Sequence, residues 1–259
     1  MQSTLRIRQL TMLTRVLSFF ALLVIAVSSA GAQVVSITQK TIEPNLIGDL
    51  GKNLSWIGKR PLVLGSVGLM ASTPAFISGE TNHPYRGWID RASPDRIFEY
   101  GDILGNGAVH VAAAVSLYFV GKALHKPDLA VLGSDLTSGL LIAGTISTGL
   151  KVVTQRTRPD GAAYSFPSGH ATMAFTTAGV IANRYGVIPG ILAETGAMYV
   201  GLSRLQENKH YITDVVAGAV LGNLIAYQVV TRRKQNEHLA ISLEPSTAGV
   251  STALRYRFK

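Results

Sequence analysis

Three short clusters of cationic and imidazole side chains have the types and spacing needed to hold an anion and move a proton. The first is KVVTQRTRP, with Lys151 and Arg158 seven residues apart, and the last is SRLQENKHYITD. Between them, PSGH at residues 167–170 opens directly into an apolar segment. With Ser168 as N-cap, this turn predicts either a plain helix start or an anion site at unpaired N–H groups, where Gly169 lets a ligand approach the backbone.

The last cluster places His210 and Asp214 four residues apart, which predicts that both lie on one face of a helix. The carboxylate can then accept a hydrogen bond from Nδ1 of the imidazole, which fixes the tautomer and leaves Nε2 unprotonated. The pair therefore predicts a nucleophilic His210. Taken without the other clusters, it is as often a structural surface pair.

Lys151, Arg158 and Arg204 are three cations that repel one another when they lie close together, unless an anion offsets their charge. Planar guanidinium groups match phosphate oxygens in a bidentate manner. A helix from His170 to Arg184 runs roughly 22 Å, and a return helix of similar length brings Arg204 back level with His170. We therefore expect the three clusters to meet at one end of an up-down bundle and to surround a phosphate.

The elements that must position these residues are apolar stretches separated by polar loops. A membrane-spanning helix needs about 20 apolar residues, so three of the stretches qualify marginally and the bundle can be embedded in a membrane or soluble. The predicted fold is all-α, an up-down bundle of about six helices. The charge-free stretches are residues 61–79, 103–121, 136–150, 171–183 and 215–231.

Both ends of the chain differ from the bundle. Residues 1–32 combine three arginines, an apolar run and an Ala-Gly-Ala site, which predicts a signal peptide and an exported protein. Near the C-terminus, apolar and polar residues alternate around residues 245–249, which predicts a β-hairpin. The expected organisation is a signal peptide (1–32), N-terminal helices with a surface loop (33–100), a catalytic bundle (101–234) and a hairpin tail (235–259).

Composition narrows the function classes. The 259-residue chain carries a net charge of +9 but no Lys/Arg-rich run interleaved with aromatic residues, so we expect no nucleic-acid partner. An anionic lipid surface or a phosphate ligand suits the charge better. The absence of cysteine excludes disulfides, a thiolate nucleophile and a cysteine-based metal site.

The motifs Lys151-x6-Arg158-Pro159, PSGH at 167–170 and Ser203-Arg204-x5-His210-x3-Asp214 resemble the three-part signature of the type 2 phosphatidic acid phosphatase family. That superfamily also contains bacterial non-specific acid phosphatases and vanadium-dependent haloperoxidases. The resemblance covers roughly residues 100–232. It implies an enzyme that needs no metal and no cofactor.

By the family's pattern, His210 attacks phosphorus to form a phosphohistidine, with Asp214 orienting it. His170 protonates the leaving alkoxide and then activates water. The resemblance assigns the phosphate oxygens to the following side chains and backbone groups: Lys151, Arg158, Ser168, Gly169 and Arg204.

Several alternatives stay open at the level of the sequence. A soluble periplasmic acid phosphatase shares the motifs and the signal peptide. A haloperoxidase is less favoured because only seven residues separate Pro159 from Pro167. A non-catalytic phosphate-binding envelope protein is the competing class.

The apolar helices favour a lipid-linked substrate and membrane association. Arg184 and the basic residues 232–234 fall at the end of the bundle away from the site, which predicts a site on the periplasmic side, at the outer face of an inner membrane. The sequence leaves the oligomeric state open.

Overall fold

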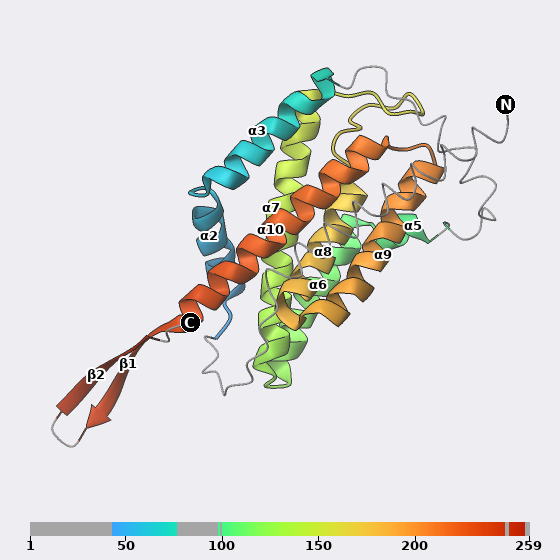
Figure 1. Cartoon of the computed structure of the whole chain (residues 1–259). Coiled ribbons are helices and arrows are strands. Elements are labelled where there is room, and N and C mark those ends of the chain that lie inside the picture. The colour runs from blue at the N-terminus through green and yellow to red at the C-terminus, as the bar shows by residue number, and fades with distance from the viewer. Residues whose placement is uncertain (1–42, 77–97, 99, 247–248, 257–259) are drawn as a thin grey trace.

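The computed structural model of the chain describes residues 43–76, 98, 100–246 and 249–256 (Figure 1). Within these residues the fold is helical, as the sequence predicts, with eight helices instead of about six. The helices are α2 (Leu46–Ile57), α3 (Pro61–Phe76), α5 (Gly101–Leu104), α6 (Gly107–Ala123), α7 (Pro127–Thr154), α8 (Gly169–Tyr185), α9 (Val187–Gln206) and α10 (Ile212–His238).

The additional helices arise from local stop and start signals. Asn106 divides the apolar stretch 103–121, because its side chain caps the first turn of α6 and accepts a hydrogen bond from the backbone N–H of Ala108 at 2.9 Å. The four-residue α5 therefore stands apart from α6. In the N-terminal segment, a turn at Gly58 separates α2 from α3, which begins at Pro61.

Helices α7, α8, α9 and α10 form the up-down arrangement that carries the predicted site. The hairpin between α8 and α9 turns at Gly186, whose φ of 89° lies in the region that favours glycine. This turn confirms the predicted reversal after Tyr185. As a result, the start of α8 and the end of α9 lie at the same end of the bundle (Figure 1).

Helices α8 and α10 approach each other closely. A Cβ atom placed on Gly222 of α10 would lie 2.7 Å from both the carbonyl oxygen of Thr172 and the backbone nitrogen of Thr176 in α8. Gly218 is equally restricted, since its Cβ would lie 2.7 Å from the carbonyl oxygen of Ser168. Such contacts need glycine on one helix, so the spacing of Gly218 and Gly222 fixes how α10 lies along α8.

A buried network of charged residues lies at the bundle end opposite the start of α8. Arg233 of α10 donates through Nε to Asp135 of α7 at 2.5 Å and through Nη2 to Asp49 of α2 at 2.9 Å. Arg184, at the end of α8, donates to the second oxygen of Asp135 at 2.7 Å, and Arg232 lies 3.6 Å from Asp49. These arginines lie at the end away from the site, as expected, but they are paired with carboxylates inside the fold, which weakens their use as a guide to membrane orientation.

The residues that the structure describes contain two helical stretches long and apolar enough to cross a membrane, Pro127–Thr154 and Ile212–Gln235. The sequence expectation agrees for 215–231, which also qualified, but differs elsewhere, because it had 61–79 and 103–121 qualify and 136–150 fall short. The apolar helices Pro61–Pro74 and Gly107–Ala123 are shorter than a span requires. Because 67% of each candidate window is buried inside the fold, as in a soluble core helix, length alone is weak support for a membrane span.

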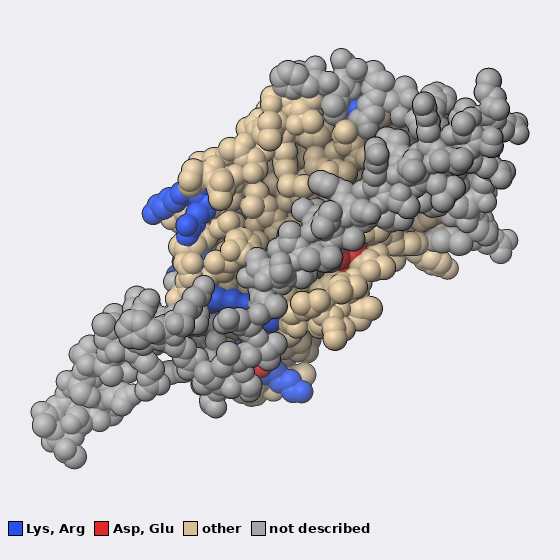
Figure 2. Space-filling model, viewed as in Figure 1, with Lys and Arg blue, Asp and Glu red and all other residues tan. Residues whose placement is uncertain are grey.

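The surface adds a second observation on the membrane question. Leucines of α3 are strongly exposed, with Leu62 at 80% and Leu69 at 70%. At the start of α9, Ile188 and Leu192 are exposed to a similar extent. The surface over α3 in Figure 2 is almost free of charged side chains, with Lys and Arg gathered at its edge. Exposed apolar surface of this kind is typical of a lipid or protein contact.

Strands β1 (Leu239–Ser246) and β2 (Gly249–Tyr256) follow α10 and pair in an antiparallel register. An isolated two-stranded hairpin is only marginally stable in water, so the C-terminal hairpin stays a prediction. The predicted signal peptide (1–32) and the predicted surface loop (78–96) lie outside the described residues. The proposed domain boundaries also stay predictions.

Candidate active site

His210 lies in the turn between α9 and α10, not on the helix face predicted from its spacing to Asp214. Helix α10 begins at Ile212, and the backbone N–H of Tyr211 donates to Oδ2 of Asp214 at 2.8 Å. Nδ1 of His210 is 3.5 Å from the same oxygen. Both side chains are buried. The predicted partnership is therefore present, but it is longer than a normal hydrogen bond and is built by a turn.

Ser168 caps α8 as predicted, and its hydroxyl accepts from the backbone N–H of Ala171 at 3.5 Å. The backbone N–H of Ser168 donates to the carbonyl oxygen of Asp214 at 2.9 Å. This bond ties the start of α8 to the start of α10. The N-terminus of α8, with Gly169 as its first residue, is thus held beside the His210 turn.

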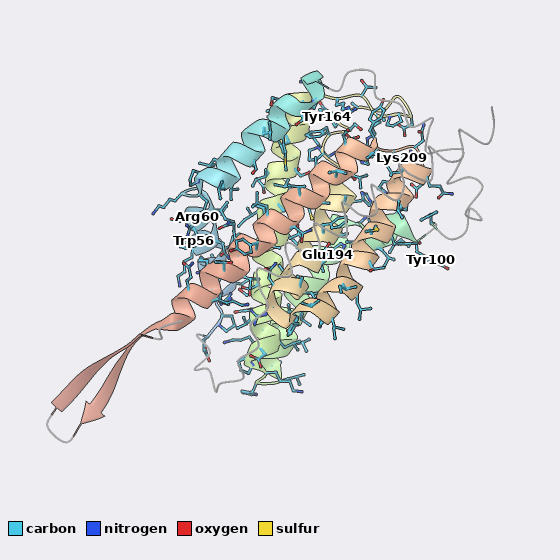
Figure 3. All side chains as sticks on the ribbon, in the orientation of Figure 1. Trp56, Arg60, Tyr100, Tyr164, Glu194 and Lys209 are labelled. Carbon is cyan, nitrogen blue, oxygen red and sulfur yellow. The ribbon has the colours of Figure 1, made fainter. Side chains whose placement is uncertain are left out.

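Lys151 reaches the same place from the last turn of α7. Its Nζ donates to the carbonyl oxygen of Tyr164 at 2.8 Å, and a Cβ atom placed on Gly169 would lie 3.8 Å from its Cε. Arg158 follows in the loop after α7, and its buried Nε has no hydrogen-bond partner among the described residues. In Figure 3, Tyr164 and Lys209 mark this end of the bundle.

His170 and Arg204 share one acidic partner, Asp102 of α5. Nη1 of Arg204 donates to Oδ1 of Asp102 at 2.8 Å, and its Nη2 donates to Glu207 at 2.7 Å. Nε2 of His170 is 3.1 Å from the same Oδ1, without the alignment of a hydrogen bond. Arg204 is buried, and its carbonyl oxygen accepts from the backbone N–H of His210 at 3.3 Å. This backbone bond joins the His170 side of the site to the His210 side.

Burial dominates the titration of both histidines. It lowers the pKa of His210 below the ordinary value, and the nearby charges of Lys151 and Arg158 act in the same direction, against Asp214. Burial also lowers the pKa of His170; Arg204 adds to this effect and Asp102 opposes it. Both shifts favour the uncharged form of the imidazole in the free protein.

All eight residues predicted for the site thus gather at one end of α7, α8, α9 and α10. Their chemical roles stay predictions, because the geometry records position only. Sequence reasoning missed three residues that contact them: Asp102, Arg156 and Ser165. Ser165 and Arg156 stand within or beside the quoted motifs, so their place in the chain was a usable signal, whereas nothing in the sequence around Asp102 marks it.

Residues 160–237 match the family model of the PAP2 superfamily. This segment contains His170, Arg204, His210 and Asp214 with the spacing that prompted the resemblance. The segment belongs to the PAP2 superfamily. Lys151 and Arg158 precede the matched residues, and β1 follows them, so the match does not extend to the first motif or to the strands.

The curated relatives that match part of this chain are named as phosphatases of lipids. The lipid A 1-phosphatase of Porphyromonas gingivalis is 39% identical over 98 residues, which cover 36% of this chain and 21% of the relative. The lipid A 4'-phosphatase of Helicobacter pylori is 32% identical and covers 45% and 65% respectively. Phosphatidylglycerophosphatase B of Bacillus subtilis is 34% identical and covers 35% and 54%. The chain thus spans between about a fifth and just under two thirds of these relatives.

Proposed function

We propose that this protein is a phosphatase that hydrolyses a lipid-linked phosphate ester or diphosphate through a phosphohistidine intermediate. The observation that carries the proposal is the meeting of His210, His170 and three cationic side chains at one end of the bundle. Histidine is able to act both as a nucleophile and as a general acid or base near neutral pH.

In the first step, Nε2 of His210 attacks phosphorus, and the bond from phosphorus to the leaving oxygen breaks. His170 in its imidazolium form donates a proton to that oxygen, so the leaving group departs as an alcohol and His170 becomes a neutral imidazole. In the second step, His170 takes a proton from water, whose oxygen attacks the phosphohistidine. The bond between phosphorus and Nε2 breaks, and inorganic phosphate and free His210 result. Asp214 supports the positive charge that develops on the imidazole of His210 in both steps.

The phosphate oxygens are held by groups already fixed before substrate arrives. Lys151, Arg158 and Arg204 offset the negative charge that builds up in the transition state, and the backbone N–H of Gly169 adds the positive end of α8. The buried, unpaired Nε of Arg158 is a donor that a phosphate oxygen satisfies. Fixed donors of this kind require little reorganisation when the reaction occurs.

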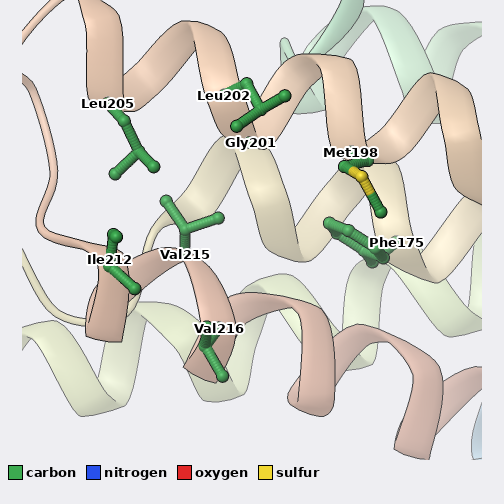
Figure 4. A pocket seen from close by; sticks show the side chains of 8 residues that line it. All are labelled: Phe175, Met198, Gly201, Leu202, Leu205, Ile212, Val215 and Val216. Atoms are coloured by element: carbon green, nitrogen blue, oxygen red, sulfur yellow. The ribbon is translucent and has the colours of Figure 1, made fainter. Parts of the chain in front are cut away.

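Two observations support a lipid as the carrier of the phosphate. The relatives are named for lipid A and phosphatidylglycerophosphate, and they do not favour the soluble acid phosphatase alternative. In addition, an apolar pocket adjoins the turn that carries His210, between α9 and the start of α10 (Figure 4). It is lined by Phe175, Met198, Gly201, Leu202, Leu205, Ile212, Val215 and Val216.

We further propose that the protein associates with a membrane and presents the site at the outer face of an inner membrane. The exposed apolar side chains of α3 and α9 support the association. Washing the membrane fraction with carbonate tests it: an associated protein stays with the membrane, and a protein released into the supernatant would refute this part of the proposal. Protease accessibility of a tag placed after residue 259 in intact spheroplasts tests the orientation.

The activity is tested by phosphate release from a panel containing p-nitrophenyl phosphate, lysophosphatidate, phosphatidate, a polyprenyl diphosphate and lipid A. We expect release from at least one lipid and loss of release in His210→Ala. Rapid acid-free quenching of the reaction with a ³²P-labelled substrate traps the labelled protein in the wild type but not in His210→Ala. A wild-type protein that releases no phosphate from any of these compounds would refute the proposed function.

A further inference from the structure

Arg156 is a charged residue that bonds Asp214 directly. It follows Gln155, which ends α7 in the left-handed conformation with φ of 46°. Nη1 of Arg156 donates to Oδ1 of Asp214 at 2.7 Å and to the hydroxyl of Thr213 at 2.8 Å. Its guanidinium group also lies over the ring of Tyr211, 4.1 Å from the centroid. The side chain therefore contacts three residues around the start of α10: Tyr211, Thr213 and Asp214.

The two oxygens of Asp214 have separate partners. While Oδ1 accepts from Arg156, Oδ2 accepts from the hydroxyl of Ser165 at 2.5 Å and from the backbone N–H of Tyr211 at 2.8 Å. Nδ1 of His210 lies 3.5 Å from this second oxygen. Because both oxygens are bonded, the carboxylate cannot rotate without breaking a bond, and Oδ2 stays directed toward the imidazole.

We propose that Arg156 is a positioning residue of this site: it fixes the carboxylate of Asp214 and neutralises part of its charge, so that His210 stays oriented and unprotonated for attack. The proposal rests on the proposed function for its catalytic consequence. Arg156 acts through Asp214. Its Nη1 donates to both Asp214 and Thr213, and it is not among the three cations assigned to the phosphate.

The electrostatic consequence follows from the charges around His210. Lys151 of α7 and Arg158 of the following loop lower the pKa of this imidazole, while Asp214 of α10 raises it. Arg156 is bonded to Asp214 and weakens its field at His210. Removing the guanidinium therefore leaves Asp214 more strongly negative, and the imidazolium form of His210 gains stability. The pKa of His210 then rises, and the fraction ready to attack falls at acid pH.

The experiment measures kcat/KM against pH for the wild type, Arg156→Gln and Arg156→Lys, with whichever compound of the panel the wild type hydrolyses fastest. The acid limb reports the pKa of His210 in the free enzyme. Arg156→Gln removes a positive charge a few ångströms from Asp214 in a partly screened site. We therefore expect the acid limb to move upward by roughly 0.5 to 1 pH unit. Arg156→Lys keeps the charge but loses the planar fork, so we expect an unmoved limb with a lower kcat.

A second readout does not depend on turnover. Titration of the histidine ring carbons by NMR, with His210→Gln to assign the resonance, gives the pKa of His210 directly. We expect a higher value in Arg156→Gln than in the wild type. Equal values in the two proteins would overturn the proposal whether or not the protein is an enzyme.

Arg184→Gln is the matched control. Arg184 also donates to a buried carboxylate at 2.7 Å, that of Asp135, but at the opposite end of α8. Both substitutions should lower the thermal midpoint, because each leaves a buried carboxylate with one partner fewer. Only Arg156→Gln should move the acid limb. An equal shift in both variants would reduce Arg156 to a structural role and overturn the proposal.

The double variant Arg156→Gln with Asp214→Asn guards against a single variant that fails to fold, since it leaves no uncompensated buried charge. If Arg156 acts through Asp214, adding its substitution to Asp214→Asn changes kcat by less than about twofold, because coupled residues are not additive. If the two substitutions instead lower kcat by factors that multiply, the proposal is overturned. If the wild type is active and the acid limb of Arg156→Gln does not move, only this inference is refuted. If the wild type hydrolyses no compound of the panel, the proposed function is refuted.

Discussion

Replacing Asp102 by asparagine tests the assignment of His170 as the general acid. The side chain of Asp102 lies 3.1 Å from Nε2 of His170 and raises the pKa of this imidazole against burial and Arg204. Asp102→Asn removes a full negative charge with little change in shape. The imidazolium form of His170 then loses a stabilising partner, so its pKa falls and its proton is lost at a lower pH.

The size of the effect follows from the geometry. Two unit charges 3.1 Å apart interact by about 1.3 kcal/mol in a water-like dielectric, which corresponds to roughly one pKa unit. The side chain of Asp102 is 64% exposed and also bonds Arg204, so solvent and the guanidinium reduce its share. We therefore expect the alkaline limb of kcat/KM to move down by about 0.5 to 1 pH unit in Asp102→Asn.

Glu207→Gln is the matched control for this measurement. Glu207 is the other acidic partner of Arg204, at 2.7 Å, but it is not among the groups that shift the pKa of His170. Its substitution should change KM through Arg204 and leave the alkaline limb in place. An alkaline limb that does not move in Asp102→Asn, or that moves upward, would show that His170 is not the acid whose protonation limits the rate.

Three further predictions use the same preparation. His210→Ala should lower kcat by more than about 10³-fold with an unchanged thermal midpoint and circular dichroism spectrum, and a variant that still turns over would end the phosphohistidine mechanism. Orthovanadate should compete with substrate because it adopts five-coordinate geometry, whereas a chelator should leave the rate unchanged; inactivation by the chelator would implicate a metal. Gly222→Ala should destabilise the fold by about 1–3 kcal/mol because its Cβ meets the backbone of α8, while Gly196→Ala, with open space around it, should not; similar thermal midpoints would contradict the close contact.

The sequence predicted the parts of the site that depend on helix lengths and local turn chemistry. Ser168 is a helix cap because the hydroxyl of a serine before a helix can accept a hydrogen bond from a free backbone N–H of the first turn. Gly186 turns the chain because glycine readily adopts a positive φ. With these two points fixed, counting residues along α8 and α9 was enough to bring Arg204 back to His170.

The parts that the sequence did not predict depend on contacts between distant segments. Spacing of four residues predicted a helix face for His210, but Asp214 caps the start of α10 and leaves His210 in the turn before it. Arg156 reaches Asp214 because Gln155, just before it, adopts a left-handed conformation. Glutamine rarely adopts this conformation, so the sequence does not predict it. Asp102 comes from a four-residue helix with no periodic pattern to identify it.

The glycine contacts between α8 and α10 determine which parts of the protein are able to move during a reaction cycle. With backbone against backbone at Gly218 and Gly222, sliding of one helix along the other meets a steric barrier within a fraction of an ångström. His170 at the start of α8 and His210 just before α10 are consequently held by one rigid pair of helices. The distance between the two histidines is therefore expected to stay constant through the cycle, whereas Asp102 and Arg204 lie on α5 and α9, outside this contact.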